Sequence, residues 1–219
     1  MEDPQSAPVG AGPFGRWLRR MRESLLGDAG MDVPCGDCTG CCTSGYSIQL
    51  RRSDVAARAR VPVEWTVEAP GFAPSELTLP ARADGHCPML EARRCTIYAQ
   101  RPQTCLDYDC RIFAAAGIDA GGADKAAINR RVRAWRFDYE DAAARRAHQA
   151  IRDAARFVRE RPEAFSAHGV RVPTGPMGIA VFAFKAHTAL LDPESPRDDL
   201  GRAAAMLAAS RTFDAPPDR

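Results

Sequence analysis

The sequence has little net charge, no long apolar run and almost no lysine. Its formal net charge is +2, so there is no overall field to attract nucleic acid. The most apolar run, PMGIAVFAF, is followed by Lys185 and falls short of the roughly 18 apolar residues that a membrane-spanning helix needs. The opening segment has acidic residues and prolines where a secretory signal has a basic tip and an apolar core. These absences predict a soluble, cytoplasmic protein that has no membrane span and no nucleic-acid partner.

Familiar catalytic motifs are also missing. The sequence contains no P-loop, no GxGxxG after a strand, no GxSxG and no HExxH. Cysteine is absent after Cys110, although eight cysteines lie between Cys35 and Cys110. No substrate pocket is therefore indicated, and whether the protein is an enzyme stays open at this stage.

The N-terminal residues 1–30 form the first predicted region. Residues 1–12 are rich in proline, glycine and alanine, which predicts disorder. Phe14, Trp17, Leu18, Met21 and Leu25 then recur at helical spacing with arginines between them, which predicts an amphipathic helix ending near Gly27.

Residues 31–115 form the second predicted region, a loop-rich one with short β pieces. YSIQL and SELTLPAR are typical of short strands, and SDVAARAR is typical of a short helix capped by Ser53. Prolines and glycines interrupt every longer pattern. This region cannot build a large regular layer by itself, so we expect another component to organise it.

Residues 116–219 form the third region, which is helical. Apolar residues from Ile128 to Val158 predict one long helix that stops at Arg161 and is open to a break near Phe137. GPMGIAVFAFKAHTALL predicts a buried helix, and Ser195 with Pro196 predicts the start of a last helix carrying Leu200, Ala203 and Leu207. The predicted fold class is mainly α, with the cysteine region packed on this helical half as one compact unit.

The stretch CGDCTGCC places four cysteines within eight residues. In a CxxC unit the backbone turns so that both sulfurs reach one metal ion, and glycines suit such a turn. Cys35, Cys38 and Cys41 form two overlapping CxxC units, as at the start of a bacterial ferredoxin run. Because neighbouring side chains diverge, we expect Cys41 and Cys42 to serve two sites or one cluster that spans both.

A second group of cysteines is more widely spaced. It comprises Cys87, Cys95, Cys105 and Cys110. The two groups together supply eight thiolates, enough for two tetrathiolate sites or for an iron-sulfur cluster and another metal. Spacing alone leaves these arrangements open.

Other uses of the thiols compete with metal binding. Disulfides are disfavoured by the missing signal and by the strain of a Cys41–Cys42 bridge. A thioredoxin-like CxxC follows a strand and opens a helix, whereas CGDC lies among further cysteines and turn formers. Simple packing does not explain four cysteines in eight residues. A free nucleophile among the eight, with Cys42 the candidate, remains an alternative.

The cysteine-containing segments together identify a resemblance. CGDCTGCC, DGHCPML, RRCTIYAQRPQTC and DYDC resemble the YkgJ family of cysteine-cluster proteins, named for a CxxCxxCC domain that chelates zinc or iron. The likeness covers about residues 31–112, and it implies that all eight cysteines bind the metal or cluster. Leu106 stands where many members of the family carry arginine. The names of some members imply an iron-sulfur oxidoreductase or a flagellin N-methylase, and the motif itself specifies neither reaction.

Charged residues near the cysteines suggest supporting roles. A zinc tetrathiolate or an oxidised four-iron cluster carries a net charge of about −2, which nearby cations stabilise. We therefore expect Arg101 first to support the metal loop. The other nearby candidates are Arg51, Arg52, Arg93, Arg94 and Arg111.

Three further residues are candidates of lower weight, and three other histidines are assigned no role at the site. His86, beside Cys87, is a candidate ligand, with an exposed turn as the simpler interpretation. Asp107 and Asp109 flank Tyr108 and are candidate acid-base groups or the exposed start of a helix. His148, His168 and His187 are expected to be structural or exposed.

The sequence thus predicts a metal-binding protein that holds an iron-sulfur cluster, or alternatively zinc, through Cys35, Cys38, Cys41, Cys42, Cys87, Cys95, Cys105 and Cys110. An oxidoreductase-like redox role is the leading interpretation. The alternatives are a structural zinc module whose helices bind a protein partner and a cluster-assisted methyl transfer.

Overall fold

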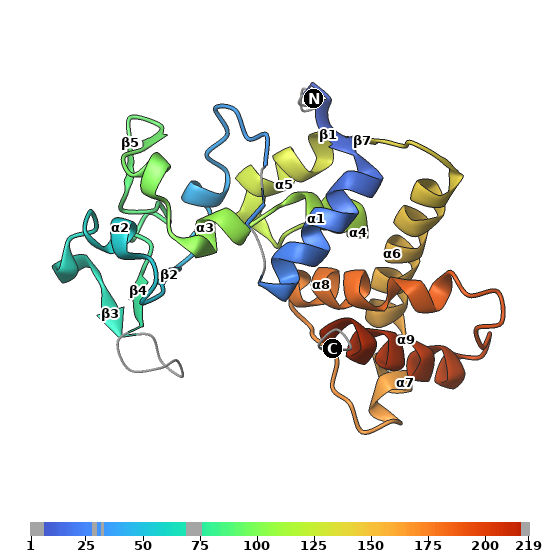
Figure 1. Cartoon of the computed structure of the whole chain (residues 1–219). Helices are drawn as coiled ribbons and strands as arrows, with labels where there is room; N and C mark the ends of the chain where they lie inside the picture. The colour runs from blue at the N-terminus through green and yellow to red at the C-terminus, as the bar shows by residue number, and fades with distance from the viewer. Residues whose placement is uncertain (1–6, 28–29, 32, 69–75, 216–219) are drawn as a thin grey trace. The chain divides into compact units, whose positions relative to one another are not determined.

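The computed structural model describes residues 7–27, 30–31, 33–68 and 76–215 (Figure 1). The chain forms two compact units, which are described separately here. The first combines Met1–Leu18, Cys110–Gly121 and Val132–Arg219, and the second combines Arg19–Asp109 and Gly122–Arg131. The mainly helical class with short strands in the N-terminal half is confirmed. Residues 122–131, which the sequence assigned to the helical region, belong to the unit that holds most of the cysteines.

A parallel two-stranded sheet in the first unit differs from two expectations. Strand β1 (Val9–Pro13) pairs with β7 (Trp135–Asp138). Residues 9–12, expected to be disordered, are therefore a strand, while residues 1–6 lie outside the described part of the chain. The strand β7 also divides the predicted long helix into α5 (Ala126–Ala134) and α6 (Ala142–Glu160).

The division of the long helix has a local cause. Trp135 and Phe137 alternate with polar residues, and aromatic side chains in such an alternation favour a strand once β1 supplies hydrogen bonds. The Asp141 side chain then accepts a hydrogen bond from the Ala144 amide (2.8 Å) and caps the start of α6. The predicted break near Phe137 and the stop at Arg161 agree with the structure.

The N-terminal helix follows its sequence pattern. Helix α1 (Phe14–Leu26) buries Phe14, Trp17 and Met21, and it ends before Gly27, whose φ of +87° suits glycine. The ring of Phe14 stacks on His148 with centroids 4.6 Å apart. The expectation of an amphipathic helix ending near Gly27 is confirmed.

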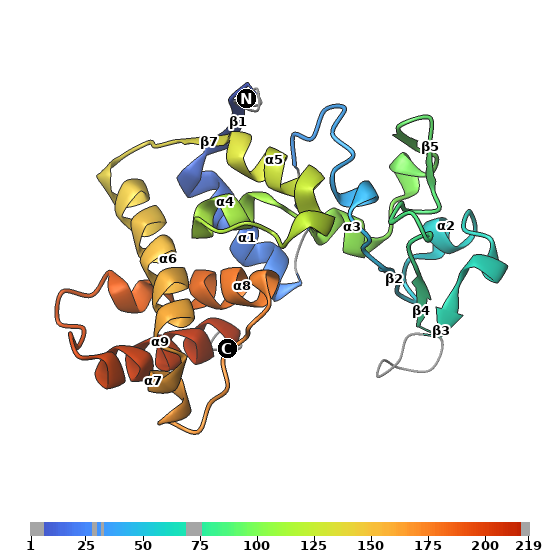
Figure 2. The ribbon, with the colours of Figure 1, turned by 180° about the vertical axis from the view of Figure 1, so that it is seen from behind.

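Helices build the rest of the first unit (Figure 2). They are α4 (Arg111–Ala116), α6, α7 (Pro162–Ser166), α8 (Pro176–Ala186), the short η5 (His187–Leu190) and α9 (Asp199–Asp214). Helix α8 packs against α4, α6 and α9. The last helix begins at Asp199 rather than near Ser195, because Asp198 caps it by accepting from the Gly201 amide (2.8 Å). Leu200, expected on its buried face, is exposed.

The second unit contains a small antiparallel sheet. Its strands β2 (Ile48–Leu50), β4 (Leu77–Leu79) and β3 (Val67–Glu68) lie in the order β2-β4-β3, in line with the predicted extended pieces. The short helix α2 (Val55–Arg58) starts after Asp54 rather than Ser53. The remaining elements are η1 (Cys41–Thr43), η2 (Val63–Trp65), β5 (Leu90–Glu91), β6 (Arg94–Cys95), η3 (Tyr98–Gln100), α3 (Gln103–Asp107) and η4 (Ala123–Lys125).

This second unit has an apolar core of its own. Its buried residues are Leu50, Ala57, Val61, Leu79, Met89 and Ile97. Cys87 and Cys95 pack against this core from the side. The core is small, in keeping with the expectation that loops of this kind need a further stabilising component.

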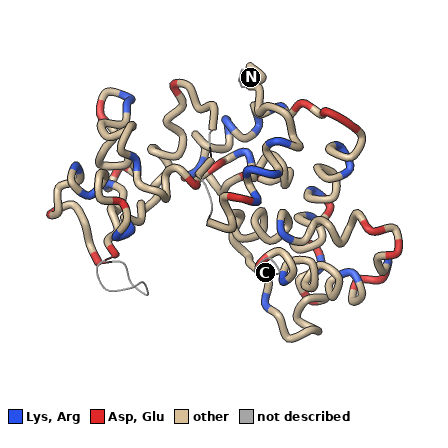
Figure 3. Tube along the Cα trace, viewed as in Figure 1, with Lys and Arg blue, Asp and Glu red and all other residues tan. Residues whose placement is uncertain are grey.

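Two global features bear on function. No helix in the described ranges is both long and apolar enough to cross a membrane. Basic and acidic residues alternate along the chain in the view of Figure 3, which agrees with the small net charge.

Candidate metal centre

The CxxCxxCC loop folds as a series of tight turns. The Cys38 amide donates to the Cys35 carbonyl (3.0 Å), and Gly36 between them has a φ of +57°. The Gly40 amide in turn points at the Cys38 sulfur, 3.5 Å away. The turn expected of a CxxC unit, with an N–H group directed at sulfur, is therefore present.

The adjacent cysteines Cys41 and Cys42 both lie in η1, and their thiol groups influence each other's pKa. A hydrogen bond between the two thiol groups lowers the pKa of Cys41 to about 7 and raises the pKa of Cys42. The two protons leave the pair in separate steps because one sulfur stabilises the charge on the other. That Cys41 and Cys42 serve two sites, or one cluster that spans both, stays a prediction.

Backbone hydrogen bonds join the second cysteine group to this loop. The Cys87 amide donates to the Cys42 carbonyl (2.7 Å), and the Gly45 amide donates to Gly85 (2.8 Å). Burial, the largest influence, raises the pKa of Cys87, whereas the Met89 backbone and the Arg82 charge act to lower it. Segments more than forty residues apart in the chain therefore meet at Cys42.

A tight hairpin presents Cys95. Strands β5 and β6 pair Leu90 with Cys95, and the connecting Ala92 and Arg93 have positive φ values of 43° and 62°. A two-residue turn of this kind usually contains asparagine and glycine, so Ala92 and Arg93 carry no recognisable hairpin signal. The Thr96 amide then donates to the Met89 carbonyl (2.9 Å), so that the hairpin stays close to the Cys87 loop.

Helix α3 presents Cys105 and is held against the small sheet. The Thr104 hydroxyl donates to the Gln49 carbonyl (2.9 Å), and the Gln103 amide donates to the Asp54 carboxylate (2.8 Å). These two contacts fix the helix on β2 and on the residue that precedes α2. The position of Cys105 is thus set by polar contacts to the same sheet whose core carries Cys87 and Cys95.

The thiols act on one another electrostatically. Burial, followed by the Cys41, Cys87 and Cys95 thiols, raises the pKa of Cys105 to about 12. Burial and then the Cys41 and Cys38 thiols raise the pKa of Cys35 to about 11. Buried sulfurs this close oppose one another's ionisation, and a bound cation reverses that effect because it stabilises every thiolate at once.

Cys110 belongs to the first compact unit, whereas the other seven cysteines belong to the second. Its sulfur accepts a hydrogen bond from the Trp135 indole nitrogen (3.2 Å), and Cys110 is the residue that precedes α4. The prediction that Cys110 is a ligand with the others therefore stays a prediction.

Several arginines supply positive charge to the thiols. The Arg101 guanidinium stacks on the Tyr98 ring (3.7 Å) and lowers the pKa of both Cys41 and Cys105. This proximity agrees with the role expected of Arg101. Two further arginines, which sequence reasoning missed, are Arg82 and Arg131, and they lower the pKa of Cys87 and Cys35 respectively.

Other expected candidates have different partners. The Arg51 guanidinium pairs with Asp107 (3.1 Å), and Arg111 donates to the Ala11 carbonyl (3.1 Å) in the first unit. His86 lies half exposed, with its ring nitrogen 3.4 Å from Asp84. Asp109, expected at an exposed helix start, is instead buried and raises the pKa of Cys35. Arg52, Arg93 and Arg94 are exposed.

Three histidines lie in the helical unit. His148 and His187 are buried, and His168 is exposed with its Nε2 atom 3.0 Å from the Leu200 carbonyl. The Tyr139 hydroxyl lies 2.7 Å from His148 Nδ1. These positions agree with the structural or exposed roles expected of them.

The donor set suits a thiophilic metal in its chemistry. Thiolates are the preferred ligands of zinc and of iron-sulfur clusters, and the N–H group that Gly40 directs at the Cys38 sulfur is a contact of the kind that stabilises metal-bound sulfur. Within the described ranges, no three Cys, His, Asp or Glu side chains stand close enough to hold one metal ion. The fold therefore gathers the sulfurs without placing them at ligand distances.

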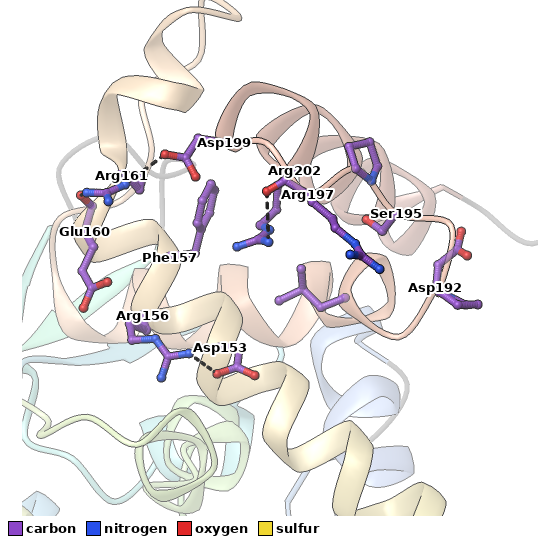
Figure 4. Close-up of a pocket in the computed structure, with 13 residues that line it drawn as sticks. Asp153, Arg156, Phe157, Glu160, Arg161, Asp192, Ser195, Arg197, Asp199 and Arg202 are labelled. Atoms are coloured by element: carbon purple, nitrogen blue, oxygen red, sulfur yellow. Dashed lines mark hydrogen bonds and ion pairs between the residues drawn. The ribbon is translucent and has the colours of Figure 1, made fainter.

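The helical unit contains a separate hollow of about 440 Å³, shown in Figure 4. It lies between the end of α6 and the start of α9, where Arg161 pairs with Asp199 (3.0 Å) and the Arg202 guanidinium lies 5.3 Å from the centre of the Phe157 ring. Its lining contains arginines and carboxylates in equal number and no cysteine. This balance of charges in the lining favours neither an anionic nor a cationic ligand.

The loop geometry and the sulfur-rich donor set define the class of this module, which is a cysteine-cluster metal-binding domain. Residues 34–126 match a family described as "CxxCxxCC: Putative zinc- or iron-chelating domain". Residues 34–126 therefore carry a CxxCxxCC domain, as the resemblance implied. No curated protein and no solved structure matches the chain.

Proposed function

We propose that the thiols of the second unit hold an iron-sulfur cluster, with zinc as the alternative, and that the bound centre completes the fold of this unit. The observation that carries the proposal is the hydrogen bond from the Cys87 amide to the Cys42 carbonyl (2.7 Å). It brings the two cysteine groups together in a domain whose family is described as chelating zinc or iron. Neither cysteine group contains all the thiols of the second unit, so a centre that uses them all needs both groups.

The number of sulfurs favours a centre with several metal atoms. A structural zinc ion takes four ligands, and the second unit contains seven cysteines. Cys41 and Cys42 are neighbours in one 3-10 turn, and their thiols interact. Two neighbouring thiols suit a multi-metal cluster better than a single tetrahedral ion. An iron-sulfur cluster with an electron-transfer role is the form of the proposal that these features favour.

A structural zinc module that binds a protein partner is the second candidate. The observation that favours it is the exposure of Val63, Trp65 and Val67, which lie on η2 and on β3 at the edge of the small sheet. Glu64 and Glu68 alternate with them. Such an edge suits an extended partner segment with apolar and basic residues.

Anaerobic isolation of the full chain tests the proposal. An iron-sulfur protein is brown and contains iron and acid-labile sulfide in comparable amounts, and its absorption bleaches on chemical reduction. A colourless chain with stoichiometric zinc and no reducible centre supports the second candidate instead. A chain that binds neither metal after anaerobic reconstitution contradicts both.

A further inference from the structure

We propose that η4 and α5 clamp the CxxCxxCC loop, with Lys125 and Arg131 as positioning residues for its metal-binding thiols. The inference rests on the proposed function, because it concerns how the metal-binding loop is held. It adds residues outside the cysteine motifs, and Arg131 lies beyond the residues that match the family.

The two ends of the loop are held by basic side chains from one segment. The Arg131 guanidinium donates to the carbonyl of Cys35, where the loop begins (2.9 Å). The Lys125 ammonium donates to the carbonyl of Ser44, where the loop ends. Lys125 and Arg131 lie within seven residues of each other, so one short segment spans the whole loop.

The middle of the loop packs directly on the same segment. Gly40 lies so near α5 that a methyl group on its Cα would stand 3.3 Å from the Ala127 carbonyl oxygen and 3.4 Å from Ile128 Cα. The backbone of Gly40 has a φ of −53°, which any residue adopts, so this close approach alone explains the need for glycine. The buried Ser44 hydroxyl also donates to the Gly40 carbonyl (2.6 Å) and closes the loop on itself.

The Lys125 side chain is itself fixed in place. Its ammonium lies 4.4 Å from the centre of the Tyr46 ring and 2.9 Å from the Asp124 carboxylate, and only 16% of the side chain is exposed. A side chain held this way loses little further freedom when it binds a carbonyl, so its contact to Ser44 is persistent. The loop is therefore attached at three points, at Cys35, Gly40 and Ser44.

Attachment at three points fixes where the sulfurs stand. Cys35, Cys38, Cys41 and Cys42 all lie between the two carbonyls that Arg131 and Lys125 hold. Residues that orient ligands without touching the metal typically change metal affinity by about 10-fold to 100-fold when they are replaced. The clamp also places the positive charge of Arg131 near Cys35, whose metal complex is anionic.

Metal release from the full chain tests the clamp. The chain is reconstituted with Zn²⁺, an excess of a chromogenic chelator is added, and the release of zinc is followed by absorbance. Arg131→Gln is expected to release zinc about 10-fold faster or more, and Gly40→Ala is expected to do the same. Arg130→Gln is the matched control, because Arg130 is the exposed neighbour on the same helix.

Two further measurements separate positioning from folding. Arg131→Lys retains a charged donor and is expected to release zinc more slowly than Arg131→Gln does. Such a partial recovery is not expected if the loss of Arg131 simply unfolds the loop. Metal content, measured after separate reconstitution with zinc and with iron and sulfide and before the chelator is added, checks the proposed function itself. If the unmodified chain holds neither zinc nor iron, the proposed function fails; if it holds either metal and Arg131→Gln releases that metal within twofold of the unmodified rate, the clamp alone is refuted.

Discussion

Replacing Leu79 by alanine tests whether the second unit depends on bound metal for its fold. Leu79 is 2% exposed, and it belongs to a core of six buried residues against which Cys87 and Cys95 pack. Truncating a buried leucine costs about 2 to 5 kcal/mol of the free energy of unfolding. A core of this size has little stability to lose, because small apolar cores supply only a few kcal/mol.

Bound metal changes the outcome by a larger amount. Structural zinc contributes roughly 10 to 16 kcal/mol in domains that fold on binding it, which exceeds the loss from Leu79→Ala. We therefore expect the metal-free variant to lose the structure of the second unit and the metal-loaded variant to keep it. The helical first unit, which has a separate and larger buried core, is expected to stay folded in both.

Hydrogen exchange read by mass spectrometry distinguishes the two units. The informative amides are those of β2 and β4, where Gln49 faces Thr78. In metal-free Leu79→Ala they should exchange at the rate of an unfolded chain, and metal should restore their protection. Val63→Ala is the matched control, because Val63 is 75% exposed in the same unit and its loss should change stability by less than about 0.5 kcal/mol. If the β2 and β4 amides of metal-free Leu79→Ala were as well protected as those of the metal-loaded unmodified chain, the reasoning would be refuted.

Three further predictions concern single groups. In the reduced, metal-free chain, iodoacetamide at pH 7 should modify Cys41 well before Cys105. The reason is that the hydrogen bond from Cys42 lowers the pKa of Cys41 to about 7, while burial raises the pKa of Cys105 to about 12. Equal modification rates of the two cysteines, measured by mass spectrometry, would contradict this prediction. Burial, and then the charge of Arg152, lower the pKa of His148, so the folded state resists its protonation and thermal stability should fall as pH drops below about 6.5; His148→Gln should flatten that part of the pH profile. The double variant Ala92→Asn, Arg93→Gly should have a higher thermal midpoint of unfolding and an unchanged metal content, because it relieves about 1 kcal/mol or more of backbone strain at positive φ. A lowered midpoint would show that the turn is not strained.

The sequence predicted elements whose signal is local. The apolar spacing from Phe14 to Leu25 predicted α1, and the alternation in YSIQL and SELTLPAR predicted the strands that pair through Ile48 and Leu79. It could not predict β7, because Trp135 also fits the helical stripe from Ile128 to Val158 and only the pairing with β1 decides between helix and strand.

At the candidate site, too, local signals in the sequence were readable and long-range contacts were not. Spacing and family resemblance identified the cysteines, and the expected proximity of Arg101 to them agrees with the structure. Lys125 and Arg131 escaped notice because contacts to Ser44 and Cys35 span 81 and 96 residues and leave no local pattern. The hairpin that presents Cys95 was also missed, since its turn lacks the usual glycine and asparagine.

The central claim is that thiols from both cysteine groups hold one inorganic centre. The most direct test is the metal and sulfide content of the anaerobically isolated full chain beside those of Cys38→Ser and Cys87→Ser, which each remove one thiol from a different group. Stoichiometric metal in the unmodified chain, reduced in both variants, is the result expected here. Metal content that falls with Cys38→Ser and is untouched by Cys87→Ser would contradict a shared centre.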